Sequence, residues 1–331
     1  MLIYVLRRVL WMVPALFGIT ALLFVVMRLA PGDPATVRFG DMSSASTSGV
    51  DFEAAITKFR ERYHLDEPIH VQYGYWLKSV ATLDFGYEFA RPNVPVRQEL
   101  WERLQVTVPL SVVSVLLAYL IALPLGVFSA VRQRSIFDRV STLVLFLLYS
   151  VPTFWAGLML ILIFGQTGLG WLPVLGLHDK DAAQLSGWPW TRDLLLHCIL
   201  PVATMTYGSL AYLSRIMRVG MLETVRQDYI RTARAKGLAE KAVVMRHALR
   251  NSLIPVVTVF ATILPVLIGG SVLVEQIFNI PGMGLYAYEG LLKRDYNVVM
   301  ATTTISAVMT LLGFLLSDIL YAVVDPRISY E

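Results

Sequence analysis

Six runs of about 20 mostly apolar residues recur along the chain, and each is long enough to cross a bilayer as a helix. They occupy residues 9–30, 105–130, 139–165, 198–222, 252–273 and 300–323. None alternates apolar and polar residues as the strands of an outer-membrane barrel do. With 56% hydrophobic and 16% charged residues, the chain has more apolar side chains than a soluble core needs. We predict an all-α integral membrane protein with six transmembrane helices.

Charge between the runs predicts the orientation of the helices. Basic residues gather before the first run, in the short connection 131–139 and in the connection 223–251. Six spans place these three segments on one side, and short basic loops face the cytoplasm. We therefore expect both termini in the cytoplasm and three outer segments, at 31–104, 166–197 and 274–299. The first run is too long for a secretory signal and no small-residue cleavage site precedes Pro31, so we interpret it as a retained anchor.

Proline occurs within several of the runs, and membrane helices tolerate it. We favour kinks that shape the packing over hinges of a pathway. The third run is long and has Pro152 near its centre, which predicts a tilted or broken helix there. In the first outer segment, DFEAAITKFRERYHL (51–65) has the charge and apolar spacing of a helix.

Nucleotide and metal chemistry find no motif here. Glycine is never followed by lysine, so the chain lacks the GxxxxGK[ST] phosphate loop and is not expected to hydrolyse nucleotide itself. The five histidines show no ligand spacing and the lone Cys198 excludes a CxxC site, so we predict no metal site and no catalytic residue.

Ion-coupled carriers place ionisable residues at the bilayer midplane. Here Arg28, Glu275 and Asp318 lie near span ends, which disfavours a proton-driven carrier. A membrane enzyme would need a convergent catalytic cluster, and carboxylates such as Asp84 and Glu88 are interpreted as a solvated face. An ATP-independent channel or secondary carrier and a membrane enzyme stay as distant alternatives.

The connection 223–251 is the most informative segment. Nine of the 28 Lys and Arg residues lie between Arg215 and Arg250. QDYIRTARAKG predicts a helix that Gly237 ends in a left-handed conformation, and EKAVVMRHALRNSLI predicts a second helix that runs to Pro255. Such a pair suits contact with a soluble partner, and equally its charges could serve topology and anionic lipid.

The sequence of this connection resembles that of the permease subunits of ABC-type importers of the dipeptide, oligopeptide and nickel group. That family's loop reads EAA, three residues, Gly, nine residues, then I-x-L-P. Here Arg231-Thr232-Ala233 and Gly237 match the first part, while His247 and Arg250 replace Ile and Pro. The wording of this loop looks like the peptide-permease variant of the family, and the resemblance extends from about residue 3 to 328. The segments that carry it are RTARAKGL, RHALRNSLIP, RLAPGDP, YHLDEPIHVQYGYWL, DFGYEF, VPTFWAGL, VEQIFNIPGMG, RDYNVV and DPRI.

The resemblance implies a type I ABC importer permease fold in a bacterial inner membrane. It divides the chain into an N-terminus with the first span (1–30), an outer helical cap (31–104), spans two to four (105–222), a cytoplasmic coupling loop (223–251) and spans five and six (252–331). It implies a second homologous permease, two ABC ATPase subunits and an extracytoplasmic solute-binding protein as partners, besides membrane lipid. ATP and Mg²⁺ would be bound by the ATPases, so no cofactor and no nucleic acid are expected on this chain.

The resemblance also assigns residues. The coupling helix would contact an ATPase through Arg231, Thr232, Ala233, Arg234, Ala235, Lys236, Gly237 and Leu238. An outer gate or binding-protein contact would involve Glu275, Phe278, Pro281 and Gly282, and simple packing against the permease partner is the competing interpretation of that segment. Peptides are the favoured cargo, while nickel or another small solute stays open.

Overall fold

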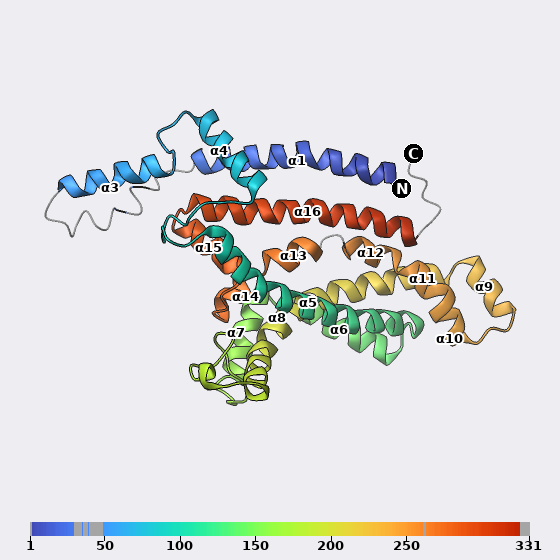
Figure 1. Cartoon of the computed structure of the whole chain (residues 1–331). Coiled ribbons are helices and arrows are strands. Elements are labelled where there is room, and N and C mark those ends of the chain that lie inside the picture. The colour runs from blue at the N-terminus through green and yellow to red at the C-terminus, as the bar shows by residue number, and fades with distance from the viewer. Residues whose placement is uncertain (1, 30–34, 36–38, 40–48, 261–262, 325–331) are drawn as a thin grey trace. The chain divides into compact units, whose positions relative to one another are not determined.

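The computed structural model describes residues 2–29, 35, 39, 49–260 and 263–324. These residues are mostly helical (Figure 1), and the Tyr87–Pro95 bridge is the one β-pairing recorded among them. Four helices in this part of the chain are long and apolar enough to cross a membrane, and a bent pair makes a fifth candidate. The four are α1 (Leu2–Leu29), α5 (Val96–Val131), α8 (Trp188–Val225) and α16 (Tyr296–Val324). The prediction of an all-helical membrane protein is confirmed.

The third predicted run is broken at Pro152, as expected. It forms α6 (Ile136–Ser150) and α7 (Thr153–Phe164), whose axes differ by 99°. Val151 is extended, with ψ 124°, because the ring of a following proline disfavours the helical conformation. By contrast α1, α5 and α8 continue through their internal prolines.

The fifth predicted run is helical on both sides of a short gap in the described residues. Four short elements follow one another there: α11 (Leu249–Ser252), α12 (Ile254–Phe260), α13 (Ile263–Gly269) and α14 (Val272–Ile277). Residues 261 and 262, inside this run, lie outside the described residues. Gly270 separates α13 from α14 at a φ of +66°, a conformation that favours glycine. The six-span count and the orientation of the termini therefore stay predictions.

The chain forms two compact units, residues 1–106 with 282–311 and residues 107–281 with 312–331. The first unit contains α1, α3 (Gly49–Arg62), α4 (Ile69–Thr82), α15 (Met283–Leu292), residues 96–106 of α5 and residues 296–311 of α16. Its core is aromatic: rings of Phe59, Tyr63 and Phe89 pack with centroids 4.3–5.1 Å apart. The helix predicted for 51–65 is confirmed as far as Arg62, where α3 ends, and residues 63–65 form a turn.

A buried ionic cluster lies in this unit. Glu88 is 3% exposed, receives two hydrogen bonds from Arg91 at 2.6 and 2.7 Å, and accepts one from the Tyr286 hydroxyl at 2.9 Å. Glu99, also buried, pairs with Arg91 at 3.1 Å and with Arg103 at 2.5 Å. The interpretation of Glu88 as a solvated carboxylate was wrong, because residues some 200 positions away cover it; Asp84 is exposed as expected.

Asp295 joins the same core from the residue before α16. Its carboxylate accepts hydrogen bonds from the backbone N–H groups of Phe89 at 2.5 Å, Ala90 at 3.2 Å and Val298 at 3.2 Å. Burial raises the pKa of Asp295 to about 6, although these three donors favour the ionised form. The side chain therefore holds the 89–90 loop against the start of α16.

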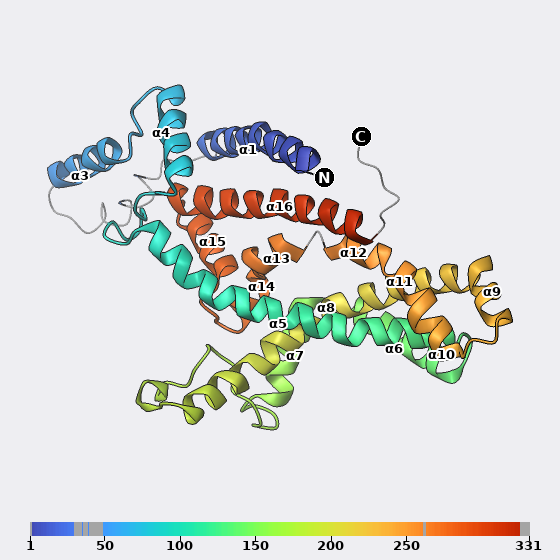
Figure 2. The ribbon, with the colours of Figure 1, turned by 45° about the vertical axis from the view of Figure 1, so that its right-hand side comes forward.

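The second unit contains residues 107–131 of α5, the bent pair α6–α7, and α8 to α14. In both views α6 runs beside α8 (Figures 1 and 2), and the two helices are in contact. Gly126 of α5 allows close approach to α8, since a Cβ there would lie 2.7 Å from the Ser214 carbonyl oxygen and from the Met217 Cβ. Three spans thus pack closely in this unit.

A buried ion pair joins those three helices. Asp138, in the first turn of α6, accepts two hydrogen bonds from Arg218 of α8, at 2.9 and 3.0 Å. Its Oδ1 also accepts from the Ser129 hydroxyl of α5, and its Oδ2 accepts from the Arg134 backbone N–H at 2.9 Å. The Asp138 side chain is 7% exposed and that of Arg218 is 29% exposed. Every acceptor position of this carboxylate is directed at a named donor.

Candidate functional site

The loop predicted to contact a partner folds as a helix, a glycine turn and a second helical segment. Helix α9 (Asp228–Ala235) begins after the extended Gln227 and has Asp228 in its first turn, which suits the positive end of the helix dipole. The second segment comprises α10 (Glu240–Ala242), the π-helix η2 (Val243–Ala248) and α11. Figure 1 shows α9 and α10 beyond the end of α8.

Gly237 ends α9 in a Schellman motif. Its φ is +76°, its N–H donates to the Arg234 carbonyl at 2.9 Å, and the Leu238 N–H donates to the Ala233 carbonyl at 3.4 Å. The predicted left-handed C-terminal glycine is confirmed. A Cβ built on Gly237 meets no atom of the described chain within 4 Å, so the turn is open on its outer side.

One face of α9 is buried against this chain itself. Ile230 is fully buried and Ala233 is 7% exposed, and both belong to a core that includes Met217 and Met221 of α8. The second segment adds Val243, Val244 and Ala248 to the same core. Ala233 therefore packs the helix onto its own chain, and its predicted contact with an ATPase stays a prediction.

The opposite face is exposed. Of the eight residues predicted for ATPase coupling, seven are on the surface of the described chain: Arg231, Thr232, Arg234, Ala235, Lys236, Gly237 and Leu238. They form a continuous surface of α9 and its turn, which we call the α9 surface. Its three basic side chains carry positive charge. Its small Ala and Gly residues let another surface approach the backbone closely.

An ion pair closes the turn across Gly237. Arg234 donates to Glu240 at 2.7 and 3.1 Å, and so connects α9 with α10. Hydrogen bonding to the Glu240 carboxylate raises the pKa of Arg234, and the same bond lowers the pKa of Glu240. Glu240 was not predicted from the sequence, because a spacing of six residues across a glycine turn has no helical periodicity. The pair therefore bridges the two helical segments on their exposed side.

The predicted outer gate residues are mostly interior. Glu275 is 4% exposed and accepts a hydrogen bond from the Thr107 hydroxyl at 3.0 Å, and Phe278 is 1% exposed. Gly282 is buried at the N-cap of α15, whereas Pro281 is exposed. Only Pro281 of the four offers a surface in the described chain.

Comparison with known families covers nearly the whole chain. Residues 122–330 match the family described as "Binding-protein-dependent transport system inner membrane component", and residues 1–111 match the N-terminal family of such membrane components. A component of this kind resides in the inner membrane, has no ATPase site of its own, and works with ATPase and binding-protein partners.

Two relatives match over their full length. The chain is 43% identical to the oligopeptide transport system permease protein AppB of Bacillus subtilis, covering 99% of both chains. It is 37% identical to the dipeptide transport system permease protein DppB of Alkalihalophilus pseudofirmus, covering 100% of both. Proteins this similar over their full length share the same fold.

A solved structure shares the fold. The inward-facing MetNI methionine ABC transporter matches with a TM-score of 0.53 at 18% identity, covering 69% of this chain and 97% of that one. The apolar helices and the two family matches thus agree on one class of protein. The chain belongs to the family of binding-protein-dependent transport system inner membrane components, the permeases of ABC transporters.

Proposed function

We propose that this chain is a membrane-spanning subunit of an ATP-driven importer of dipeptides and oligopeptides. The observation that supports this cargo most directly is the full-length similarity to permeases named for oligopeptide and dipeptide transport, at 43% and 37% identity. The partners in this proposal are a second homologous permease, two ATPase subunits that bind ATP and Mg²⁺, and an extracytoplasmic binding protein. The chain itself binds neither nucleotide nor metal for the transport step.

The proposed topology has six spans with both termini in the cytoplasm. The run 252–273 supplies the fifth span through α11 to α13, and the bent pair α6–α7 is the third. This arrangement puts the α9 surface and the basic connection 131–139 on the cytoplasmic side, in agreement with their charge.

In this proposal the α9 surface is seated on an ATPase subunit. ATP binding can drive transport only if the ATPases bind one state of the permease better than the other, so the contact must transmit force. Ile230 and Ala233 of α9 are buried in a core shared with α8, which supports such a role, because a displacement of α9 is then passed on to α8. For the outer segment, we propose Pro281 as the contact, with Glu275, Phe278 and Gly282 as its buried support.

Three substitutions at Gly237 test the coupling role. Any L-residue at a φ of +76° is strained, by roughly 1–2 kcal/mol. Gly237→Ala adds this strain with little bulk, whereas Gly237→Trp adds the same strain and a large side chain directed into open space. Gly237→Asn is the mild control, because asparagine tolerates the left-handed region.

The assay is co-purification of the ATPases with each tagged variant, followed by uptake of labelled dipeptides and oligopeptides by cells that carry the complete complex. We expect Gly237→Trp to lose the ATPases and uptake while Gly237→Ala and Gly237→Asn keep most of both. Equal loss in the alanine and tryptophan variants would mean that the turn matters only for folding. Full activity of the tryptophan variant would refute the contact, and an intact complex that imports no peptide would refute the cargo.

A further inference from the structure

A cavity of about 820 Å³ lies alongside α8 and is lined by α6, α8 and the start of α12. We call it the α8 groove. Its volume lies within the range of roughly 300–1,000 Å³ that ligand sites occupy. Apolar walls come from Leu145 and Phe146 of α6 and from Val219 of α8, and Tyr149 and Tyr212 add two hydroxyl groups. These two tyrosines are 67% and 51% exposed, so the groove is open to the surface of the described chain.

Two charged side chains line the α8 groove without a partner. Arg215 and Glu223 are exposed, and neither forms a hydrogen bond or an ion pair with any residue that the structure describes. Arg218, which also lines the groove, is by contrast neutralised by Asp138. The groove therefore presents one cation and one anion that the described part of the chain does not pair.

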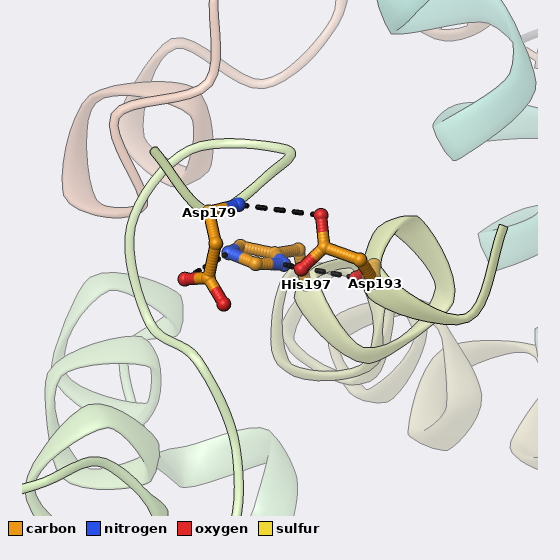
Figure 3. Close-up of side chains that lie close together, drawn as sticks. All are labelled: Asp179, Asp193 and His197. Atoms are coloured by element: carbon orange, nitrogen blue, oxygen red, sulfur yellow. Dashed lines mark hydrogen bonds and ion pairs between the residues drawn. The ribbon is translucent and has the colours of Figure 1, made fainter. Parts of the chain in front are cut away.

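The polar side chains at the start of α8 are different, because they are paired with one another. The Asp193 Oδ2 lies 2.8 Å from the His178 Nδ1 and accepts a hydrogen bond from the Asp179 backbone N–H at 3.2 Å. The His197 Nδ1 lies 2.9 Å from the Asp193 carbonyl oxygen, and its Nε2 lies 3.7 Å from the Asp179 carboxylate (Figure 3). These contacts connect the loop after α7 to α8, so this cluster has a structural role.

The position of Arg215 along the chain indicates that the groove holds water. Arg215 lies within the predicted span 198–222, about 10 Å from its end along a helix. A charged side chain is costly in hydrocarbon, so charges inside a span face the interior of a bundle or a water-filled cavity, where they mark substrate pathways. An exposed Arg215 in a groove of this size fits the second case.

The spacing of the two charges determines which ligand can reach both. Arg215 and Glu223 are two turns apart on α8, or about 12 Å along its axis. An extended peptide spans about 3.3–3.6 Å per residue, so about three to four residues cover this distance. A free peptide carries an ammonium group at one end and a carboxylate at the other, and a guanidinium binds a carboxylate through two parallel hydrogen bonds. The groove and an extended peptide are thus complementary in charge and length.

We propose that the α8 groove binds peptides of about three to four residues, with the C-terminal carboxylate on Arg215 and the N-terminal ammonium on Glu223. This inference rests on the proposed function, because it takes peptides as the cargo and adds their binding site, orientation and length. A dipeptide spans about 7 Å and so reaches one of the two charges at a time. Because both side chains are exposed to water, each contact is weak, and the peptide can leave the groove again.

Protection of a thiol in the groove measures its occupancy. The complete complex carries Phe146→Cys in a Cys198→Ala background, which leaves a single thiol on this chain, on the exposed apolar wall of the groove. Its reaction with a water-soluble maleimide is followed in inside-out membrane vesicles without ATP. The probes are trialanine, its C-terminal amide and its N-acetyl form, each at millimolar concentration. Gln227→Cys is the matched control, because Gln227 is exposed just beyond α8 and does not line the groove.

We expect trialanine to slow the labelling of Phe146→Cys about threefold, both blocked peptides to slow it less, and none of them to affect Gln227→Cys. Added Arg215→Gln should abolish the difference between trialanine and its amide but keep the difference between trialanine and its N-acetyl form. Added Glu223→Gln should do the reverse, and Arg215→Lys, which keeps the charge, should preserve both differences.

Three results would overturn the proposal: no protection by trialanine, equal protection by all three peptides, or a thiol that does not react because another subunit covers it. Uptake of labelled trialanine by the same complex is measured in parallel. Uptake without protection would contradict the groove alone, whereas a complex that imports no peptide would contradict the proposed cargo.

Discussion

Substitution of Asp138 and Arg218 tests whether one buried ion pair holds the helices of the second unit together. Asp138→Asn keeps one carbonyl oxygen but presents an NH₂ group to a site where the Arg218 guanidinium, the Ser129 hydroxyl and the Arg134 N–H all donate. Removal of one partner of a buried pair costs about 3–5 kcal/mol. Because the Arg218 side chain is 29% exposed and can be partly hydrated, we expect Asp138→Asn to lower the free energy of unfolding by about 3 kcal/mol.

A double-mutant cycle separates the pair from other effects. Arg218→Gln leaves the Asp138 charge buried and should cost at least as much as Asp138→Asn. The double variant should cost less than the sum of the single variants by about 2 kcal/mol, since both charges are then gone. Arg215→Gln, on the exposed side of α8, is the matched control and should stay within about 0.5 kcal/mol of the wild type.

The assay is equilibrium unfolding of the four proteins and the control, by titration of the detergent-solubilised chain with SDS and detection by circular dichroism. Free energies come from the midpoints and slopes of the transitions. If the single effects add within about 0.5 kcal/mol, the two side chains act independently and the reasoning from their geometry fails.

Two further predictions concern single sites. The raised pKa of Asp295, about 6, means that its ionisation opposes folding, so its contribution to stability is full below about pH 4 and falls by about 2 kcal/mol as the pH rises through 6. Melting curves between pH 4 and pH 7 should show this fall in the wild type and a smaller one in Asp295→Asn; identical profiles would contradict it. Gly126→Ala should cost about 1–3 kcal/mol, because the new methyl would meet α8 at 2.7 Å. Gly18→Ala, with no atom within 4 Å of the new Cβ, is its control and should be neutral or slightly stabilising, so equal melting temperatures for the two variants would count against close packing at Gly126.

The sequence alone was enough to predict features that depend on neighbouring residues. Long apolar runs identify membrane helices because the bilayer requires each helix to satisfy its own backbone hydrogen bonds. Pro152 predicts the break between α6 and α7, since its ring removes an N–H and disfavours the helical conformation of Val151. Gly237 predicts the end of α9, because a left-handed residue without a Cβ costs little.

The fifth predicted run shows the limit of this reasoning. Hydropathy alone predicts a single span over 252–273, but among the described residues Gly270 interrupts the helix near the end of that run, with a left-handed φ. Composition measures how apolar a segment is, and it does not determine whether neighbouring helices allow that segment to stay straight.

Contacts between distant residues came only from the tertiary structure. Glu88 is buried by Tyr286, Asp138 is paired with Arg218, and Asp179 meets His197 on α8. No local pattern marks any of these side chains, because burial and charge pairing depend on which remote segment covers them. For the same reason the sequence predicts helix α9, while only the packing of α9 on α8 decides that Ala233 is directed inward and Gly237 outward.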